Sequence, residues 1–300
     1  MIEALIQGVL LGGHYAILAA GLSLMFGVMR IINLAHGDLA VLAAYAVLLL
    51  SERAGWSPWW ALVVVLPAMG GLGMVLQHTL FARTLRAGIL LPLLVSFGLG
   101  ALIQNALFGA IGSEARSLAT AIGDLAWSSW NLPGDLAVGR LPVLTLVIAI
   151  GVLAALQALL SFTSLGRAIR AAASDPEAAA LCGVDTRRVH RWAAAIAIAL
   201  AGLAGALLAM RATVEPFAGP MLLIQAFEAV VIGGIGSLWG TLAGGIALGI
   251  AQSLGALVSP QGFQLGGHLL FLAVLALRLW RAYRHALGRP AWPRLRRLAS

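Results

Sequence analysis

The residues SLGRAIRAAASDPEAAALCGVDTRRVHRW, Ser164–Trp192, form the one long polar interruption of an otherwise apolar sequence. The stretch contains five arginines, three acidic residues and a histidine, and long apolar segments lie on both sides of it. An arginine-rich stretch between apolar segments is typical of a loop on the cytoplasmic side of a membrane. The sequence therefore predicts a membrane protein with one large cytoplasmic loop.

The middle of this loop has the pattern of a short helix over Pro176–Leu181. Ser174 and Glu177 have the spacing of a capping box, proline pre-sets the first turn, and Gly183 suits the left-handed conformation that ends a helix. Two turns of helix are marginal alone in water, because helix nucleation is costly. We expect this helix to need support from other parts of the structure.

The predicted helix has a small, flat apolar face, formed by Ala178, Ala179, Leu181 and Val184. A capped helix that is too short to be stable alone, on the basic side of a membrane, indicates a plug that docks on another protein. An ordinary polar loop that follows the charge rule explains the same residues. The residues of the loop alone leave both interpretations open.

The composition places the chain in a lipid bilayer. Hydrophobic residues make up 61% of the chain and charged residues 10%, whereas soluble domains contain about 25% charged residues. The net charge of +8 does not indicate nucleic-acid binding, because the arginines lie between apolar segments and not in runs with aromatic residues. A lone cysteine, Cys182, excludes an intrachain disulfide, and we expect no metal cluster and no cofactor.

A membrane-spanning helix needs about 20 mostly apolar residues. The segments of this kind are Ile6–Met29, Leu34–Leu50, Trp59–Phe81, Leu90–Ile111, Leu141–Phe162, Ala193–Met210, Met221–Ile235, Leu238–Val258 and Phe263–Trp280. The second and seventh are short and adjoin polar or glycine-rich breaks. We therefore predict an all-α integral membrane protein, a polytopic bundle of about 8–9 transmembrane helices with broken or re-entrant elements. A single transmembrane domain is expected over 1–280, with the polar loop at 164–192 and a basic cytoplasmic tail at 281–300.

The arginines predict the orientation. Nine spans place fifteen of the nineteen basic residues on one side: Arg30, and those in the loop after the third span, in Ser164–Trp192 and at the C-terminal end from Arg278. Arginine-rich loops stay in the cytoplasm. We therefore expect the N-terminus outside the cell and the C-terminus in the cytoplasm.

Two stretches do not fit simple lipid-facing helices. In the first, Asn33 suits the N-cap of the next helix, and Asn33, His36 and Asp38 are costly in a membrane unless they face protein or water. They act either in capping and interhelical hydrogen bonds or at a translocation pathway. Gln104 and Asn105 form a polar pair in the fourth span, and we expect them to make hydrogen bonds to other helices.

The second stretch is rich in glycine. Its pathway candidates are Gly233, Gly234, Gly236 and Ser237. Glycines at four-residue spacing let helices approach closely, and the Gly-Gly-x-Gly-Ser run breaks a helix where the freed backbone is buried or lines a cavity. Glu228 precedes the run in an apolar segment. A carboxylate there either faces the pathway or is a protonated packing residue, and the sequence leaves both open.

The order of three motifs resembles the membrane permease of branched-chain amino acid ABC importers, the LivH-type subunit. The motifs are Ile32–Asp38, the loop residues Leu165–Ala171 with Pro176–Ala179, and Gly233–Ser237 followed by Gly240 and Gly244. The resemblance covers the chain from about Gly8 to Trp280 and implies the ABC importer permease fold. It implies that the polar loop docks on an ATPase through Arg167, Arg170, Pro176, Glu177, Ala178, Ala179, Leu181 and Gly183.

The resemblance also implies the partners and the location. The expected partners are a second permease subunit of the LivM type, two cytoplasmic ATPases, a periplasmic binding protein and membrane lipid, with all subunits acting at a bacterial inner membrane. The chain departs from the family at Gln77 and His78, where a Glu-Arg pair is common, and at Glu228, where the family has a small or neutral residue.

The predicted function is therefore that of a non-catalytic subunit that imports branched-chain or related amino acids. No nucleophile lies near a base, and no ATP-binding motif is present, so the sequence offers no support for an intramembrane enzyme. Two alternatives stay open: a permease for urea or short amides, and a stand-alone secondary transporter that uses Glu228, Asp38 and His36 as an ion pathway.

Overall fold

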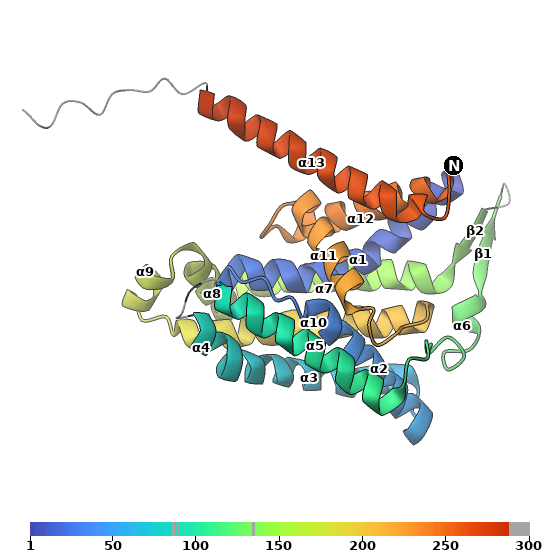
Figure 1. The fold of residues 1–300 in the computed structure, drawn as a ribbon, viewed down its shortest axis with the longest axis horizontal. Helices are drawn as coiled ribbons and strands as arrows, with labels where there is room; N and C mark the ends of the chain where they lie inside the picture. The colour runs from blue at the N-terminus through green and yellow to red at the C-terminus, as the bar shows by residue number, and fades with distance from the viewer. Residues whose placement is uncertain (86–87, 89, 134–135, 288–300) are drawn as a thin grey trace, which may run out of the picture.

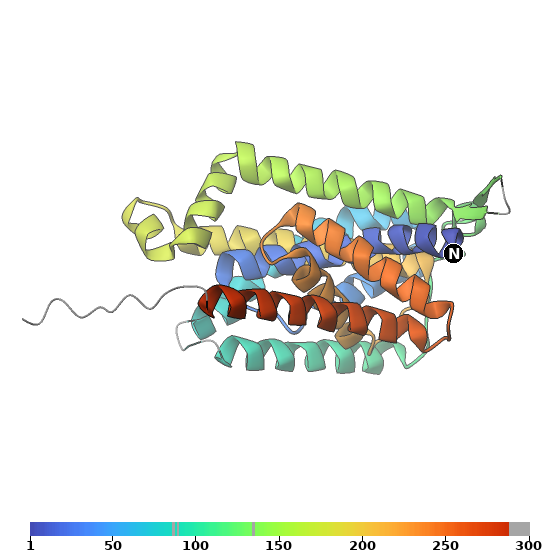
Figure 2. The same ribbon diagram turned by 90° about the horizontal axis from the view of Figure 1, so that it is seen from above.

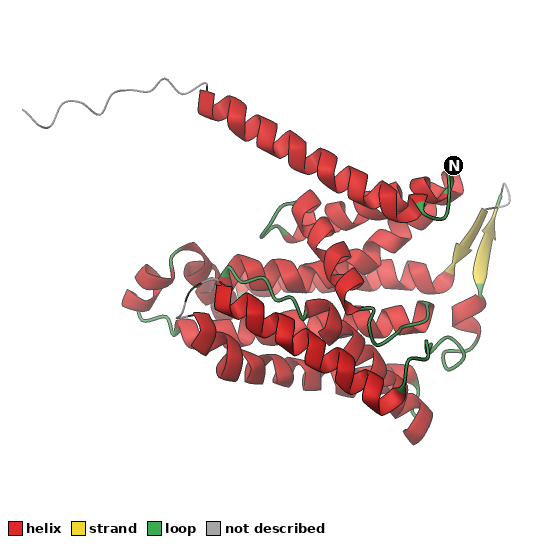
Figure 3. Cartoon of the chain, viewed as in Figure 1, coloured by secondary structure: helices red, strands yellow, loops and turns green. Residues whose placement is uncertain are grey.

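The computed structural model describes the chain except residues 86–87, 89, 134–135 and 288–300. Nine long helices lie within the described residues, and each contains most of one of the nine predicted segments. They are α1 (Ile2–Met29), α2 (His36–Ala54), α3 (Pro58–Leu76), α5 (Leu90–Ile111), α7 (Arg140–Phe162), α10 (Thr186–Arg211), α11 (Gly219–Gly233), α12 (Leu238–Ala256) and α13 (Gly262–Leu287). The prediction of a polytopic helical membrane protein is confirmed (Figures 1 and 3).

Within the described residues, seven of these helices are long and apolar enough to cross a membrane: α1, α3 with a helical extension to Thr84, α5, α7, α10, α12 and α13. The exceptions are the predicted second and seventh segments. Helix α11 has 15 residues, a length of about 22 Å, which is less than the roughly 30 Å hydrocarbon core. Helix α2 has 19 residues and carries Asp38, Glu52 and Arg53.

Both short helices follow a non-helical segment that turns back into the bundle. Helix α1 ends with Arg30 in the left-handed conformation, and the imidazole of His36 then lies 3.0 Å from the carbonyl of Leu18. Leu18 is eleven residues before the end of α1, so residues 31–35 run back by about 16 Å along that helix. Residues 212–218 return in the same way after α10, because the start of α11 packs against the start of α2.

The two halves of the chain repeat this arrangement. A long buried helix ending in Met-Arg, a returning segment and a short helix occur first as α1 and α2, and again as α10 and α11. Helix α1 packs along α12, as α10 packs along α3. Gly12 and Gly245 allow the first of these close approaches, since a Cβ on either would overlap the facing backbone. The repeat was not predicted from the sequence.

The helices α1 and α10 form the centre of the bundle, because 83% of the residues in the apolar stretch of each helix are buried. Helices α5, α7 and α13 lie on its outside and leave much of their apolar surface uncovered (Figure 2). Such a surface fits lipid or another membrane subunit. Helix α13 continues as a helix to Leu287, so the predicted boundary at residue 280 falls inside it. The rest of the predicted tail lies outside the described residues.

One end of the bundle, the α8–α9 end, carries the polar loop of the sequence. Helix α8 (Ser164–Ser174) buries Gly166, Ile169 and Ala172, and α9 (Pro176–Leu181) has the predicted bounds. The predicted capping box is wrong. The hydroxyl of Ser174 bonds Arg170 within α8, and Asp175 caps α9 by accepting from the backbone N–H of Glu177 and Ala178. Asp175 lies directly before Pro176, in the N-cap position, so its carboxylate reaches both donors.

The opposite end, the hairpin end, is built from residues 112–139. It contains the short helix α6 (Asp124–Trp127) and two antiparallel strands, β1 (Ser129–Leu132) and β2 (Leu136–Gly139), with Trp130 opposite Val138. The segment is joined to the loop after α10 by backbone bonds between Arg116 and Val214. This small hairpin is an addition to an otherwise helical fold.

Candidate functional site

The first part of the site is the interior junction where α2 and α11 begin. A Cβ on Gly37 would overlap the carbonyl of Gly219, so the two helix starts lie in direct backbone contact. Asp38 lies beside Gly219 and accepts a hydrogen bond of 2.8 Å from the side-chain amide of Gln104 on α5. A carboxylate here is favoured by the positive ends of two helices. The bond also confirms that Gln104 makes an interhelical contact, whereas the same prediction is wrong for Asn105, which donates to the carbonyl of Ala101 within α5.

Asn33 and His36 lie at this junction, and both are 0% exposed. Asn33 does not form the predicted N-cap, because the N-cap is Ala35. Its side-chain oxygen instead accepts from the N–H of Ala35 in the turn before the helix. His36 donates from Nε2 to the carbonyl of Leu18. Their remaining nitrogens, Nδ2 of Asn33 and Nδ1 of His36, have no partner among the described residues.

The glycine run forms the turn between α11 and α12. Gly234 and Gly236 have φ of 99° and 82°, which favours glycine. The N–H of Gly236 donates to the hydroxyl of Ser23 on α1, and Ser237 caps α12. Close helix approach belongs to Gly233 and its neighbours in α12, because a Cβ on Gly233 would overlap the carbonyl of Gly240. The four-residue spacing predicts a close-approach face at Gly236, Gly240 and Gly244. The latter two pack against α11, whereas Gly236 has room for a Cβ and its N–H bonds α1 instead.

Glu228 lies at one wall of an apolar cavity of about 570 Å³ between α11, α13 and the returning segment 31–35. Its Oε1 atom contacts Nδ1 of His268 on α13, while Oε2 is buried and has no partner among the described residues. The remaining lining residues are apolar: Ile32, Leu34, Leu223, Ile224, Phe227, Phe271 and Leu272. A cavity with an aliphatic and aromatic wall and one carboxylate is suited to a small apolar molecule that carries a cation.

The docking candidates divide between two sides of α9. Ala179 and Val184 turn inward, and Ala179 is buried. Leu181 is 90% exposed, and Ala178 is also exposed. The predicted flat face is therefore wrong in its membership, since half of it packs on the protein itself. Gly183 has φ of 83°, which confirms the predicted left-handed position.

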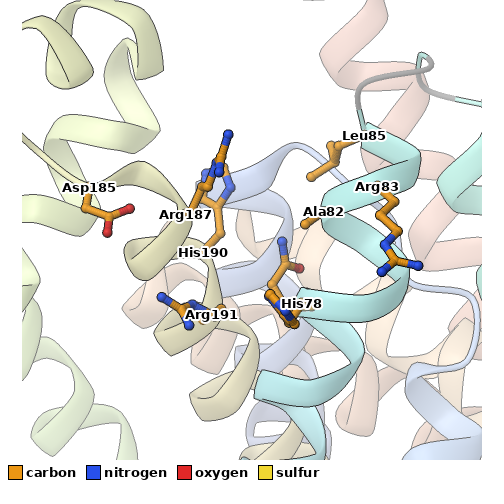
Figure 4. Close-up of a pocket in the computed structure, with 9 residues that line it drawn as sticks. His78, Ala82, Arg83, Leu85, Asp185, Arg187, His190 and Arg191 are labelled. Carbon is orange, nitrogen blue, oxygen red and sulfur yellow. The ribbon is translucent and has the colours of Figure 1, made fainter.

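A second cavity, of about 730 Å³, opens beside α9 between the end of α3 and the start of α10 (Figure 4). Here α3 continues into a π-helix, η1 (Gln77–Phe81), and a short turn, α4 (Ala82–Thr84). The cavity is lined by Gln77, His78, Ala82, Arg83, Leu85, Asp185, Arg187, His190 and Arg191. Its lining thus includes three arginines and one aspartate. A π-helix often marks a functional position.

Three residues of these two cavities, His268, Arg83 and Arg191, were missed as site residues in the sequence. His268 is isolated in an apolar segment forty residues from Glu228, so only the packing of α13 on α11 brings them together. Arg83 and Arg191 come from helices that are far apart in the sequence and meet at the cavity. The sequence signal for Arg83 and Arg191 was the clustering of basic residues in two loops that were predicted to be cytoplasmic.

Residues 4–279 match the family "Branched-chain amino acid transport system / permease component". The chain is 29% identical to the high-affinity branched-chain amino acid transport system permease protein BraD of Pseudomonas aeruginosa, over 85% of this chain and 86% of the relative. It is 26% identical to LivH of Escherichia coli, over 96% of both chains, and 28% identical to a probable LivH of Methanocaldococcus jannaschii, over 95% and 91%. No solved structure matches the chain. With almost its whole length covered, the chain belongs to the permease family of branched-chain amino acid transport systems.

Proposed function

We propose that the chain is the membrane subunit of an ABC importer that carries branched-chain amino acids across a bacterial inner membrane. The observation that carries this proposal is the family match over residues 4–279. Transport by such a subunit is not itself catalytic, so ATP hydrolysis belongs to separate subunits. The proposed assembly contains a second permease, two ATPases and an external binding protein.

The α8–α9 end is proposed to face the cytoplasm. Arg83, Arg167, Arg170, Arg187, Arg188 and Arg191 lie there, whereas the hairpin end carries Arg53, Arg116, Arg140 and Arg211. The positive-inside rule counts basic residues in short loops near the membrane, and this distribution supports the orientation. The hairpin end then faces the binding protein.

Helix α9 is the proposed ATPase contact. It has its own N-cap and C-cap, and its exposed residues include Leu181. An exposed leucine on a charged surface is stabilised when a partner covers it. Arg167 and Arg170 on the neighbouring helix, with Pro176, Glu177 and Ala178, complete the proposed contact, while Ala179 and Gly183 hold the shape of the turn.

The cavity at Glu228 is the proposed substrate contact on the translocation pathway. The aliphatic side chain of leucine, isoleucine or valine suits its apolar wall, and the free Oε2 atom suits the substrate's ammonium group. Asn33, His36 and the Gly233–Ser237 turn form the proposed wall around this route. A change in the packing of Asn33 and His36 would open it, since both side chains are fully buried in the present conformation.

Uptake by the purified assembly tests the proposal. The chain is co-expressed with its neighbouring permease, ATPase and binding-protein genes, reconstituted in liposomes, and supplied with radiolabelled leucine or urea. We expect leucine uptake that requires ATP and the binding protein. Uptake of urea in preference to leucine would overturn the substrate assignment, and uptake driven by an ion gradient without ATP would overturn the importer.

A further inference from the structure

The cavity between α3 and α10 has the charge of an anion site. Arg83, Arg187 and Arg191 line it, and within the described residues none of them forms an ion pair. The one carboxylate, Asp185, accepts from the N–H of Arg188 and caps α10. The first turn of α10 therefore also directs its positive end toward this region.

Two buried polar atoms add specific hydrogen-bonding capacity. Oε1 of Gln77 and Nε2 of His190 are inaccessible to water and have no partner among the described residues. Gln77 is 1% exposed, and both residues line the cavity. A buried carbonyl oxygen without a donor costs about 1–3 kcal/mol. A ligand with a hydroxyl group would supply the missing donor once the Gln77 amide turns this oxygen toward the cavity.

The cavity continues toward the side of the bundle. A third cavity, of about 450 Å³, shares His78 and Arg191 with the cavity of Figure 4. It is lined further by Met74, Val75, Thr79, Arg188 and Trp192. Val75 belongs to a membrane-spanning helix and is 56% exposed. The two cavities thus join a basic, polar region at the α8–α9 end to an apolar flank of the bundle.

We propose that this groove binds one anionic phospholipid whose headgroup carries a free hydroxyl, such as phosphatidylglycerol. The phosphate lies among Arg83, Arg187 and Arg191, a headgroup hydroxyl donates to Gln77, and an acyl chain follows Met74 and Val75. Basic pockets between membrane helices on the cytoplasmic side suit such headgroups. An acidic segment of a partner protein would match the charge, but it would leave the apolar half of the groove unexplained.

Native mass spectrometry of the assembled transporter tests the charge. The complex is purified from membranes that contain phosphatidylglycerol and phosphatidylethanolamine, and retained lipid is counted. The double variant Arg83→Gln/Arg191→Gln removes two cavity charges, and Arg281→Gln/Arg284→Gln removes two charges from α13 outside the cavity. Each arginine near an anionic headgroup contributes about a fivefold factor in affinity, so we expect roughly 30-fold weaker phosphatidylglycerol binding in the first variant alone.

Two results would overturn the proposal. One is equal retention of phosphatidylglycerol in both double variants. The other is loss of the ATPase from the first variant with unchanged lipid, which would make the cavity a protein contact. Addition of inorganic phosphate separates the lipid from a free anion: we expect no displacement, because phosphate lacks the acyl chain, and full displacement would contradict the lipid assignment.

The hydroxyl is tested without changing charge. Phosphatidylmethanol has the same phosphate as phosphatidylglycerol but no hydroxyl. We expect the native complex to prefer phosphatidylglycerol, and the variant Gln77→Leu to retain both lipids equally, because it removes the orphan oxygen and keeps a similar volume. If the Gln77→Leu variant still prefers phosphatidylglycerol over phosphatidylmethanol, the Gln77 oxygen does not recognise the headgroup hydroxyl.

Discussion

The substitution Glu228→Gln separates a transport role of this carboxylate from a packing role. Glu228 is 3% exposed and joins α11 to α13 through His268. Glutamine keeps the shape and one oxygen that accepts from the imidazole, but it removes the negative charge. A purely structural Glu228 would therefore tolerate the change with a shift in unfolding free energy within about 1 kcal/mol.

A substrate contact predicts a different result. An ammonium group passing the cavity would lose a charge-assisted hydrogen bond to Oε2, which contributes about 1.5–3 kcal/mol. If that contact lowers the barrier to passage, its loss slows transport by roughly 10- to 150-fold. In the proposed assembly an external binding protein captures the substrate, so we expect kcat for leucine to fall while KM changes little. Transport of a neutral amide, if the assembly accepts one, would keep its rate.

The assay is ATP-dependent leucine uptake by the reconstituted assembly, with thermal unfolding measured on the same preparation. Tyr45→Phe is the matched control, since it removes another buried bond between distant segments, the 2.9 Å contact to the carbonyl of Val214, and neither residue lines the cavity. We expect this control to transport leucine normally. Normal uptake by Glu228→Gln, or an equal loss in both variants, would refute the substrate contact.

Three further predictions concern docking, orientation and the helix junction. Leu181→Arg places a charge in the proposed ATPase contact, so we expect the permease to insert but to lose its ATPase on purification; retention of the ATPase would contradict the contact. With the native cysteine replaced, a cysteine at Ser128 should react with an impermeant thiol reagent in intact cells and one at Ser174 only after lysis, and the reverse pattern would invert the orientation. Gly219→Ala inserts a methyl against the Asp38 carboxylate and should lower the unfolding free energy by about 1–3 kcal/mol, whereas Gly71→Ala, with open space around it, should not; equal melting temperatures would argue against the tight junction.

Local rules explain what could be predicted from the sequence. Hydropathy placed all nine long helices, because a membrane-spanning helix is defined by a continuous run of apolar residues. Proline at position 176 and glycine at position 183 placed both ends of α9. The error at its N-cap was also local: Ser174 satisfied the motif, but α8 continues through it, and Asp175 is the first residue free to cap.

Contacts between distant segments could not be read in the same way. Nothing near Gly37 in the sequence indicates that Gly219 lies against it, since the contact depends on two returning segments that each bring a helix start into the interior. The same reason hides the pairing of Glu228 with His268, and it explains why Ala179 turns inward while Leu181 does not. Residues that read locally as one face are divided by what the rest of the chain packs against them. Polar residues in apolar segments can therefore be identified as site candidates from the sequence, whereas the residues that they contact can be identified only from the fold.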